Sequence, residues 1–338
     1  MRLLELEDPG WVEFVRGRPE ATLFHHPAWA RLLVDCYGYR AMALALTDGA
    51  GAVTAGLPVV EVSRPLGQRR WVSLPFTDYC PPLAAQREPE LVEELAALTR
   101  ARAVRALELR APVADHAGIQ LRSAHVRHEL ALTDDITVTW AGLFKNHRRN
   151  VRLAERGGVR IARGSSAADM ETFYRLHLRT RRRLGVPIQP RRFFRLLLER
   201  VVGPGLGFVL TAYSGDTPIA AAIFGSWNGT LIYKYSARDE RFAKLDANYL
   251  LIWTAIRIAS ENGCHTVDLG RSDLEQAPLR GFKNGWGALE KPLAYSWIAN
   301  RPIKPSSRKF QQMMGKVIRN SAPWMCRTVG ELFYRYAG

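Results

Sequence analysis

A glycine-rich segment near the end of the chain holds the residues best suited to acyl-transfer chemistry. It reads VDLGRSDLEQAPLRGFKNGWGALEKPL and places Lys283 between Phe282 and Trp286. Aromatic neighbours exclude water and so strengthen the field of a cation. When an acyl group moves to an amine, negative charge develops on the acyl oxygen, and a fixed cation lowers that barrier. We therefore predict that Lys283 is catalytic. The alternative is an exposed lysine in a glycine loop.

The same segment supplies candidate substrate-binding and proton-accepting groups. Residues 267–269 are predicted to end a parallel strand, and ligands of open α/β sheets bind beyond the carboxyl ends of strands. Glycines at 270, 281, 285 and 287 allow tight turns and close approach of the backbone. The candidate substrate-binding residues here are Asp268, Arg271, Phe282 and Trp286. Asp268 and Asp78 are candidate general bases only because they lie near strand ends.

A cluster of arginines is the second chemical signal. Residues 145–192 contain fourteen lysines and arginines against three acidic residues. Within LRTRRRLGVPIQPRRFF, arginines at 179 and 181–183 repel one another unless anions lie near them. Arginine binds phosphate through two parallel hydrogen bonds. We therefore predict that Arg179, Arg182 and Arg183 bind a substrate phosphate.

A basic stripe precedes that cluster. Five cations over residues 145–156 recur at spacings of three and four, which places most of them on one face of a helix. Such a face can follow a phosphate backbone. The alternative is an ordinary solvated helix face.

Two segments of the chain repeat one order of elements and would position these residues. The order is helix, antiparallel strand pair, strand, helix, parallel strand, and each strand pair turns at a polar glycine-containing loop. In the first segment these elements are expected at 27–37, 41–46 with 53–62, 70–74, 89–102 and 106–109. In the second they are expected at 169–184, 207–213 with 217–226, 230–236, 248–262 and 266–269.

This is the order of the GNAT (acyl-CoA N-acyltransferase) fold. We expect an α/β (α+β) protein made of two tandem GNAT-like domains, with mixed sheets flanked by helices. The first domain is expected at 1–139 and the second, with the active-site loop, at 140–295. Between the two repeats, a helix within 140–156 and a strand at 159–161 are predicted. Residues 296–338 are expected to be a basic, aromatic helical tail that packs on the first domain or lies on an anionic membrane surface.

The segment that would hold acetyl-CoA departs from the usual GNAT pattern. A standard GNAT domain binds the pyrophosphate with a glycine-rich turn at a helix N-terminus. Here no glycine occurs between Ala237 and Trp253. We therefore expect an acyl donor other than acetyl-CoA.

Composition narrows the function classes further. A net charge of +16 favours a phosphate-bearing partner, whether nucleic acid, nucleotide or membrane. The four cysteines lack a C-x-x-C pair, and three of them have apolar or aromatic neighbours in the sequence, so buried thiols in a reducing compartment are expected. Glu5, Glu7 and Asp8 precede any apolar run, so no signal peptide is expected. The sequence has no stretch of about 18 uninterrupted apolar residues, so no spanning helix is expected, and the protein is expected to be cytoplasmic.

Hydrolase and metal chemistry find little support in the sequence. No G-x-S-x-G motif is present, and none of the eight histidines has a partner recognisable by spacing. Neither the His25-His26 pair nor His125 with His128 has nearby ligands at metal-binding spacing. No bound cofactor or metal is expected.

These motifs together resemble the Fem-type aminoacyltransferases and their relatives in exopolysaccharide gene clusters, over nearly the whole chain. The strongest match is 268–272 leading into 282–287. The others are FKNHRRNVRLAERGGV, Thr180-x-x-Arg183-x-Gly185, the run 248–253, and in the first half 26–29 and 74–76.

The resemblance implies a double GNAT fold and a function. Classical members move an amino acid from aminoacyl-tRNA to an amine of a peptidoglycan precursor, and Lys283 matches the lysine that is thought to stabilise their transition state. Two departures call the muropeptide acceptor into question. Leu33 falls near the position of a pyrophosphate-binding lysine, and no long coiled-coil arm interrupts the second half.

The sequence therefore predicts an N-acyltransferase of cell-envelope, peptidoglycan or exopolysaccharide biosynthesis. Aminoacyl-tRNA is the expected donor, with acyl-CoA as the second choice, and an envelope or polysaccharide precursor is the expected acceptor. Contact with the inner face of an anionic membrane is a further expectation. The alternative is a non-catalytic protein on a GNAT scaffold that binds nucleic acid or a membrane surface.

Overall fold

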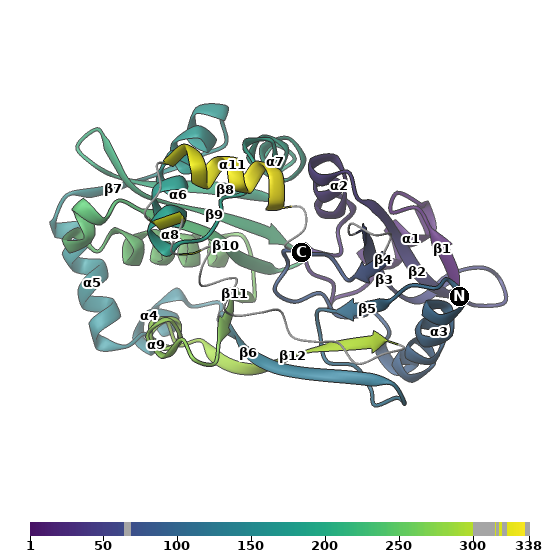
Figure 1. The fold of residues 1–338 in the computed structure, drawn as a ribbon. Helices are drawn as coiled ribbons and strands as arrows, with labels where there is room; N and C mark the ends of the chain where they lie inside the picture. The colour runs from purple at the N-terminus through teal and green to yellow at the C-terminus, as the bar shows by residue number, and fades with distance from the viewer. Residues whose placement is uncertain (64–68, 300–314, 316–317, 320–322, 335–338) are drawn as a thin grey trace. The chain divides into compact units, whose positions relative to one another are not determined.

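The computed structural model describes residues 1–63, 69–299, 315, 318–319 and 323–334, which divide into two units (Figure 1). The first comprises residues 1–126 with 292–299, and the second comprises 127–291 with the described residues from 315 onward. The division falls inside two strands, β6 (Ile119–Ala131) and β12 (Leu289–Ala299).

The first unit contains a sheet with the strand order β1-β2-β3-β4-β5-β12. All neighbouring pairs are antiparallel except β4 and β5, which are parallel. Its elements before β6 are β1 (Arg2–Leu4), α1 (Pro9–Arg16), α2 (Pro27–Tyr37), β2 (Arg40–Thr47), β3 (Val53–Ser63), β4 (Arg69–Val72), the short η1 (Ala85–Arg87), α3 (Glu88–Ala101) and β5 (Ala106–Leu109).

The second unit contains a sheet with the strand order β6-β11-β10-β9-β8-β7. Strands β7 to β10 pair antiparallel, and β10 pairs parallel with β11. The elements are α4 (Ile136–Gly142), α5 (Lys145–Arg156), β7 (Val159–Gly164), α6 (Ala167–Leu184), α7 (Arg191–Leu197), η2 (Leu198–Val202), β8 (Gly207–Ser214), β9 (Thr217–Trp227), β10 (Thr230–Arg238), η3 (Glu240–Leu245), α8 (Ala247–Glu261), β11 (Thr266–Asp273), α9 (Ala277–Asn284) and α11 (Pro323–Phe333).

The expected duplication is confirmed by this topology. Strands β2 to β5 repeat the pairing of β8 to β11, with two antiparallel pairs followed by a parallel one. Helix α2 precedes the first set as α6 precedes the second, and α3 and α8 supply the crossovers to the parallel strands. The α/β fold with two GNAT-like repeats is therefore present.

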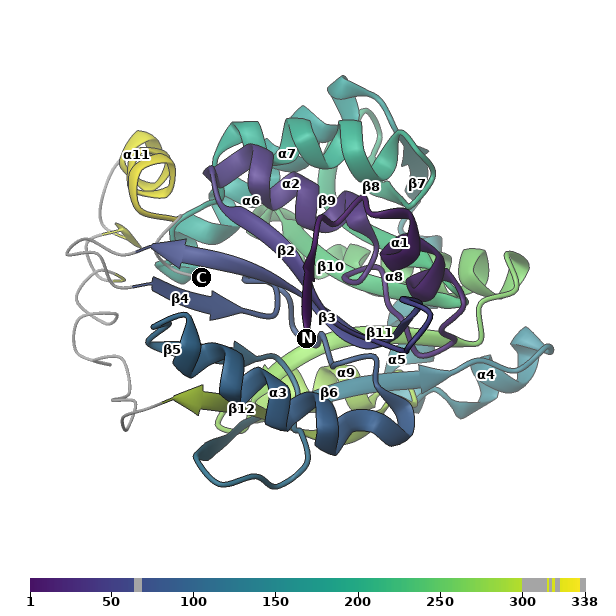
Figure 2. The same ribbon diagram turned by 90° about the vertical axis from the view of Figure 1, so that its right-hand side faces the viewer.

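Helices cover both faces of each hairpin. Because successive side chains of a strand point to opposite faces of the sheet, each strand contributes residues to the packing on both sides. In the first unit, positions 42, 44 and 46 of β2 form one core cluster with residues of α3. Figure 2 shows α3 and α1 on different sides of the strands of this unit. On the other face, Trp11 of α1 lies against Gly56 of β3, where a Cβ would stand 2.9 Å from the ring. Close packing of α1 therefore requires glycine at position 56.

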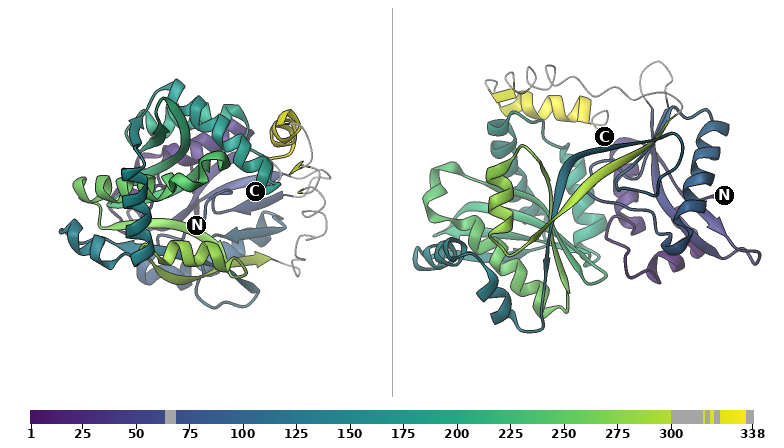
Figure 3. Two further views of the ribbon diagram at one scale, coloured as in Figure 1. Left: turned by 90° about the vertical axis from the view of Figure 1, so that its left-hand side faces the viewer. Right: turned by 90° about the horizontal axis from the view of Figure 1, so that it is seen from below.

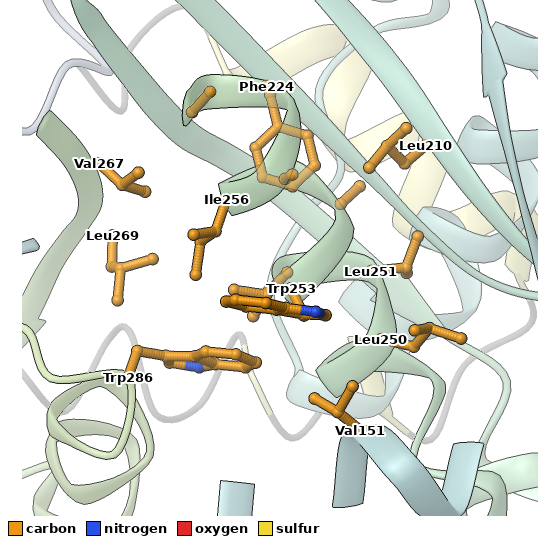
Figure 4. Packing of buried hydrophobic residues seen from close by; sticks show 14 of the residues in the cluster. Val151, Leu210, Phe224, Leu250, Leu251, Trp253, Ile256, Val267, Leu269 and Trp286 are labelled. Carbon is orange, nitrogen blue, oxygen red and sulfur yellow. The ribbon is translucent and has the colours of Figure 1, made fainter. Parts of the chain in front are cut away.

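The core of the second unit follows the same alternation. Phe208, Leu210 and Ala212 of β8 join Ile256 of α8 in one cluster, part of which appears in Figure 4. Helix α6 also contacts β8, β9 and β10, and the intervening positions of β8 point to its side of the sheet. The sheet thus separates α6 from α8.

Several elements differ from the sequence-based expectations. The helix expected within 140–156 is two helices, because Leu143 and Phe144 adopt extended backbone angles between α4 and α5. Strands β6 and β12 were not predicted. Helix α11, which is yellow in Figure 3, packs on α6 within the second unit. The other residues of the tail lie largely outside the described part of the chain.

Two expectations about the whole chain can be compared with the structure. No helix within the described residues has both the length and the apolar character needed to cross a membrane. All four cysteines are free thiols, and Cys80, Cys264 and Cys326 are buried, as predicted.

Candidate functional site

Lys283 lies in helix α9, whereas an active-site loop was expected in this segment. Its side chain is 5% exposed, and its ammonium donates hydrogen bonds to the carbonyls of Gly270 (2.9 Å) and Arg271 (2.8 Å) in β11. An ammonium has three N–H groups, so two of them are oriented by the backbone of the neighbouring strand. The result is a fixed cation in surroundings where its field is stronger than at the surface.

A buried chain of hydrogen bonds lies next to this lysine. His128 of β6 is completely buried, with its Nε2 3.1 Å from the Ser272 hydroxyl and its Nδ1 3.0 Å from the Asn284 amide oxygen. The Asn284 amide nitrogen donates to Glu290, which is also paired with Arg280. Because that amide nitrogen is committed to Glu290, its oxygen faces His128, and Nδ1 must carry the imidazole proton.

The charge of His128 is set by the same surroundings. Burial lowers the pKa of His128, and the nearby Lys283 ammonium lowers it further. The imidazole is therefore neutral and accepts the Ser272 hydroxyl proton at Nε2. Sequence reasoning missed this group because His128 is 144 residues from Ser272 and 156 from Asn284, so no local spacing could reveal it.

The other predicted residues of this segment have different roles. Trp286 is fully buried in the core of the second unit, near Trp253 in Figure 4, and its contact with substrate stays a prediction. Asp268 is 8% exposed and accepts a hydrogen bond from the Gly270 amide at 2.7 Å. Arg271 is partly exposed in β11. Phe282 is partly buried and lines a hollow beside α8.

Helix α9 is joined to α5 through a buried histidine. His147 of α5 lies with its Nε2 2.8 Å from the Phe282 carbonyl oxygen, and its ring packs against Tyr249 and Trp286. A Cβ at Gly285 would stand 1.9 Å from this ring. Glycine is therefore required at 285, as the expected close approach of the backbone implied. Burial also lowers the pKa of His147, so this imidazole is neutral.

The hollow beside Phe282 lies at the start of α8 and has a cavity volume of about 100 Å³. The first residues of a helix present amide groups without helical partners, which favour anions. Asp246 precedes α8 in a left-handed conformation (φ 52°) and makes no side-chain cap. The hollow is lined by Ile219, Ala220, Arg238, Asp239, Phe242, Ala243, Asp246, Ala247, Asn248, Tyr249 and Phe282.

The predicted arginine cluster forms the C-terminal end of α6, where much of its charge is already paired. Arg179 contacts Asp239 and Arg183 contacts Glu240, each at 2.9 Å. The pKa of Asp239 is lowered chiefly by hydrogen bonds from Arg241, with a contribution from Arg179. Arg182 is partly exposed in the same turn. The repulsion that suggested an external anion is thus relieved by carboxylates of this chain, and phosphate binding here stays a prediction.

The remaining candidates do not form a site of their own. Asp78 belongs to the first unit, where its carbonyl accepts a hydrogen bond from Tyr295 at 2.8 Å. Within the described residues, no group of three or more His, Cys, Asp or Glu side chains is arranged to hold a metal ion.

Comparisons with known proteins bear on this geometry. Residues 142–283 match the family described as "Acetyltransferase (GNAT) domain". No curated protein sequence matches the chain.

Similar solved structures extend the likeness to most of the chain. The crystal structure of FemX has a TM-score of 0.68 at 14% identity, covering 93% of this chain and 100% of that one. The C-terminal domain (DUF2156) of a candidate lysylphosphatidylglycerol synthetase from Agrobacterium fabrum has a TM-score of 0.58 at 12% identity, covering 86% and 91%. A tandem GNAT protein from the clavulanic acid biosynthesis pathway has a TM-score of 0.54 at 12% identity, covering 89% and 98%.

At these identities the likeness concerns the fold, and it agrees with the duplicated topology and with the Fem-type resemblance of the sequence. Residues 142–283 of the second unit match the GNAT domain family, and the chain has a tandem GNAT fold like that of FemX.

Proposed function

We propose that this protein transfers an aminoacyl or acyl group to an amine of a cell-envelope, peptidoglycan or exopolysaccharide precursor. The GNAT domain over residues 142–283 and the FemX-like fold support acyl transfer. The observation that carries the proposal is the Lys283 ammonium, which is buried and held by two backbone carbonyls.

Lys283 would act on the charge that forms during transfer. Attack of an amine on the acyl carbon moves negative charge onto the acyl oxygen. A cation that is already oriented needs no rearrangement when this charge appears, which is the main advantage of preorganised electrostatics. The attacking amine would lose its proton to water or to the departing donor.

Aminoacyl-tRNA is the proposed donor. The glycine-rich turn of acetyl-CoA enzymes is replaced here by the turn η3 and by Asp246, both at the rim of the hollow beside α8. Arg179 is ion-paired with Asp239, which lines the hollow. Arg183 is ion-paired with Glu240, the first residue of η3. Phosphates of a nucleic-acid donor would exchange with these carboxylates as partners of the arginines.

The alternative is a GNAT scaffold without activity that binds nucleic acid or a membrane. Such a protein would bind its partner through exposed cations. The Lys283 side chain is only 5% exposed and would not contribute to that binding. The Lys283 environment therefore favours the enzyme.

A donor comparison tests the proposal directly. The protein is incubated with labelled aminoacyl-tRNA or labelled acetyl-CoA and with a panel of amino-sugar and peptide amines, and label on the amine is measured. We expect transfer from aminoacyl-tRNA. Transfer from acetyl-CoA alone would overturn the proposed donor. Absence of transfer from either, with folded protein, would favour the non-catalytic alternative.

A further inference from the structure

Helix α5 presents a cationic face to solvent. At about 100° per residue, its five cations fall within a sector of about 100° around the helix. The buried residues His147, Val151 and Ala154 lie on the opposite side. The residues of this face, called the α5 cationic face below, are Lys145, Arg148, Arg149, Arg152 and Arg156.

The charge of the α5 cationic face is only partly compensated within the described part of the chain: Glu155 lines the same groove, and Arg149 interacts electrostatically with Asp246. None of its five cations forms an ion pair with a described carboxylate, in contrast to Arg179 and Arg183 at the end of α6. Arg148 donates to the carbonyl of Ala141, and Arg152 lies over the Trp140 ring at 5.5 Å. These contacts hold the arginines in place and leave their charge intact.

The face borders an open groove and exposed apolar side chains. Helices α4 and α5 line the groove, which has a volume of about 810 Å³. Trp140 and Ala141 of α4 contribute to it, and α5 contributes its five cations and Glu155. Val138, Phe144 and Leu153 on the same two helices are 54%, 56% and 40% exposed. Large apolar side chains in water are unfavourable unless a partner covers them.

We propose that this α4–α5 surface docks on the anionic headgroups of a phospholipid bilayer. Apolar side chains among cations suit the boundary between headgroups and acyl chains, where both kinds of side chain are satisfied. Each cation near an anionic membrane strengthens binding about five-fold. A polynucleotide would neutralise the cations and leave Val138, Phe144 and Leu153 in water, so the lipid surface fits the whole patch better.

This proposal goes beyond the proposed transferase activity and does not depend on it. Docking involves the exposed residues of α4 and α5, whereas the chemistry is assigned to α9 and β11, and the buried His147 of α5 that contacts α9 is not part of the docking surface. Binding to vesicles can therefore fail while transfer from a soluble donor persists, and the reverse can also occur.

Flotation with vesicles tests the charge component. The full chain is mixed with vesicles of phosphatidylcholine containing phosphatidylglycerol, and separately with vesicles of phosphatidylcholine alone. We expect binding to the first, and about 100-fold weaker binding for the triple variant Arg149→Glu/Arg152→Glu/Arg156→Glu.

The matched control is Arg100→Glu/Arg192→Glu/Arg257→Glu, which has the same net charge and alters exposed arginines on other helices. It should bind nearly as well as the unaltered protein. An equal loss in both triple variants, or no binding to anionic vesicles by the unaltered protein, would overturn the proposal.

The apolar component has its own test. Phe144→Ser should weaken vesicle binding roughly ten-fold at both low and high salt, because burial of a phenyl ring is not screened. Leu121→Ser, at a position that is 50% exposed in β6, is the control and should change little. A polynucleotide surface would give the opposite pattern: the α5 triple variant would lose binding to tRNA while its flotation stayed unchanged. That result would replace the membrane proposal.

Discussion

At the scale of single residues, the site relies on side chains whose partners are fixed by burial. Lys283 is held by the carbonyls of Gly270 and Arg271, and neutral His128 lies between Ser272 and Asn284. Both side chains are almost inaccessible to water. A substitution at either position therefore changes the electrostatics of the site and also leaves buried polar groups without partners.

Replacement of Lys283 should lower both turnover and stability, and the two effects can be measured separately. Lys283→Ala is expected to lower turnover about 100- to 1,000-fold through loss of charge stabilisation. Two buried carbonyls also lose a donor, so stability should fall by about 1–3 kcal/mol. Turnover with the donor identified by the transfer assay and urea unfolding are the measurements. Lys291→Ala, which alters a half-exposed lysine, is the control. Unchanged turnover in Lys283→Ala would remove the lysine from the mechanism.

Buried histidines should make stability sensitive to acid. Burial lowers the pKa of His25 to about 4, and its Nδ1 accepts the Thr22 amide proton at 2.9 Å, a bond that protonation breaks. Because this pKa is below the unfolded value near 6.5, the unfolded chain binds the proton first. Stability should therefore be highest above pH 6.5 and fall by roughly 1.4 kcal/mol per pH unit toward pH 4 from this residue.

Urea unfolding between pH 7 and pH 4.5 measures this dependence. His25→Gln keeps an acceptor and a donor near the same positions but cannot titrate, so its stability should change less with pH. A pH dependence identical to that of the unaltered protein would mean that other groups cause the acid sensitivity.

At the scale of elements, α9 owes its position to contacts at both of its sides. Lys283 fastens it to β11, and the Phe282 carbonyl contacts His147 of α5. The close approach of α5 depends on the absence of a side chain at Gly285. The fixed ammonium is thus a property of three packed elements.

Two glycines of this region allow a matched comparison. Gly285→Ala places a Cβ 1.9 Å from the His147 ring, so the ring must move and its contact with the Phe282 carbonyl is lost. We expect a loss of about 1–3 kcal/mol in stability, together with lower transfer activity. Gly281 lies within α9, and a Cβ added there would have no atom within 4 Å. Gly281→Ala should therefore be neutral or slightly stabilising. Thermal unfolding of both variants checks this, and similar Tm values would contradict the packing argument.

At the scale of the whole molecule, the second unit is completed by the C-terminal helix. Helix α11 packs on α6, with Cys326 buried and its Sγ near the Val186 carbonyl. This contact extends beyond the segment that matches the GNAT domain, which ends at residue 283. The C-terminal region therefore contributes to the core of the second unit.

Gly330 tests that contribution. A Cβ at this position would stand 1.9 Å from the Ile188 carbonyl oxygen, so Gly330→Ala should push α11 away and cost about 1–3 kcal/mol. Gly142→Ala, with no atom within 4 Å of the added Cβ, is the control. Equal urea midpoints for the two variants would show that α11 adds little to stability. The alternative role of the tail on a membrane, tested by flotation of a chain truncated after Pro305, stays a prediction.

Local sequence patterns were enough to predict the helices and strands of the two repeats. Helix α2 and strand β5 have the predicted bounds, and the hairpins differ from prediction by one or two residues, because alternating apolar residues and polar turns define them locally. The same patterns led to the tandem GNAT fold and the Fem-type resemblance, which the comparisons confirm. Lys283 could be chosen as a candidate because its aromatic and glycine neighbours are adjacent in sequence, and its role in catalysis stays a prediction.

Contacts between distant residues were decided only by the tertiary structure. The sequence contains the arginines of α6 and the carboxylates of Asp239 and Glu240, but about 60 residues separate them, and only folding pairs them. Trp286 is close to Lys283 in the sequence, but the fold buries its side chain in the core. Conversely, among the described residues the five cations of the α5 cationic face form no ion pair with a carboxylate. Charge pairing and burial are properties of three-dimensional proximity, and composition and spacing do not encode them.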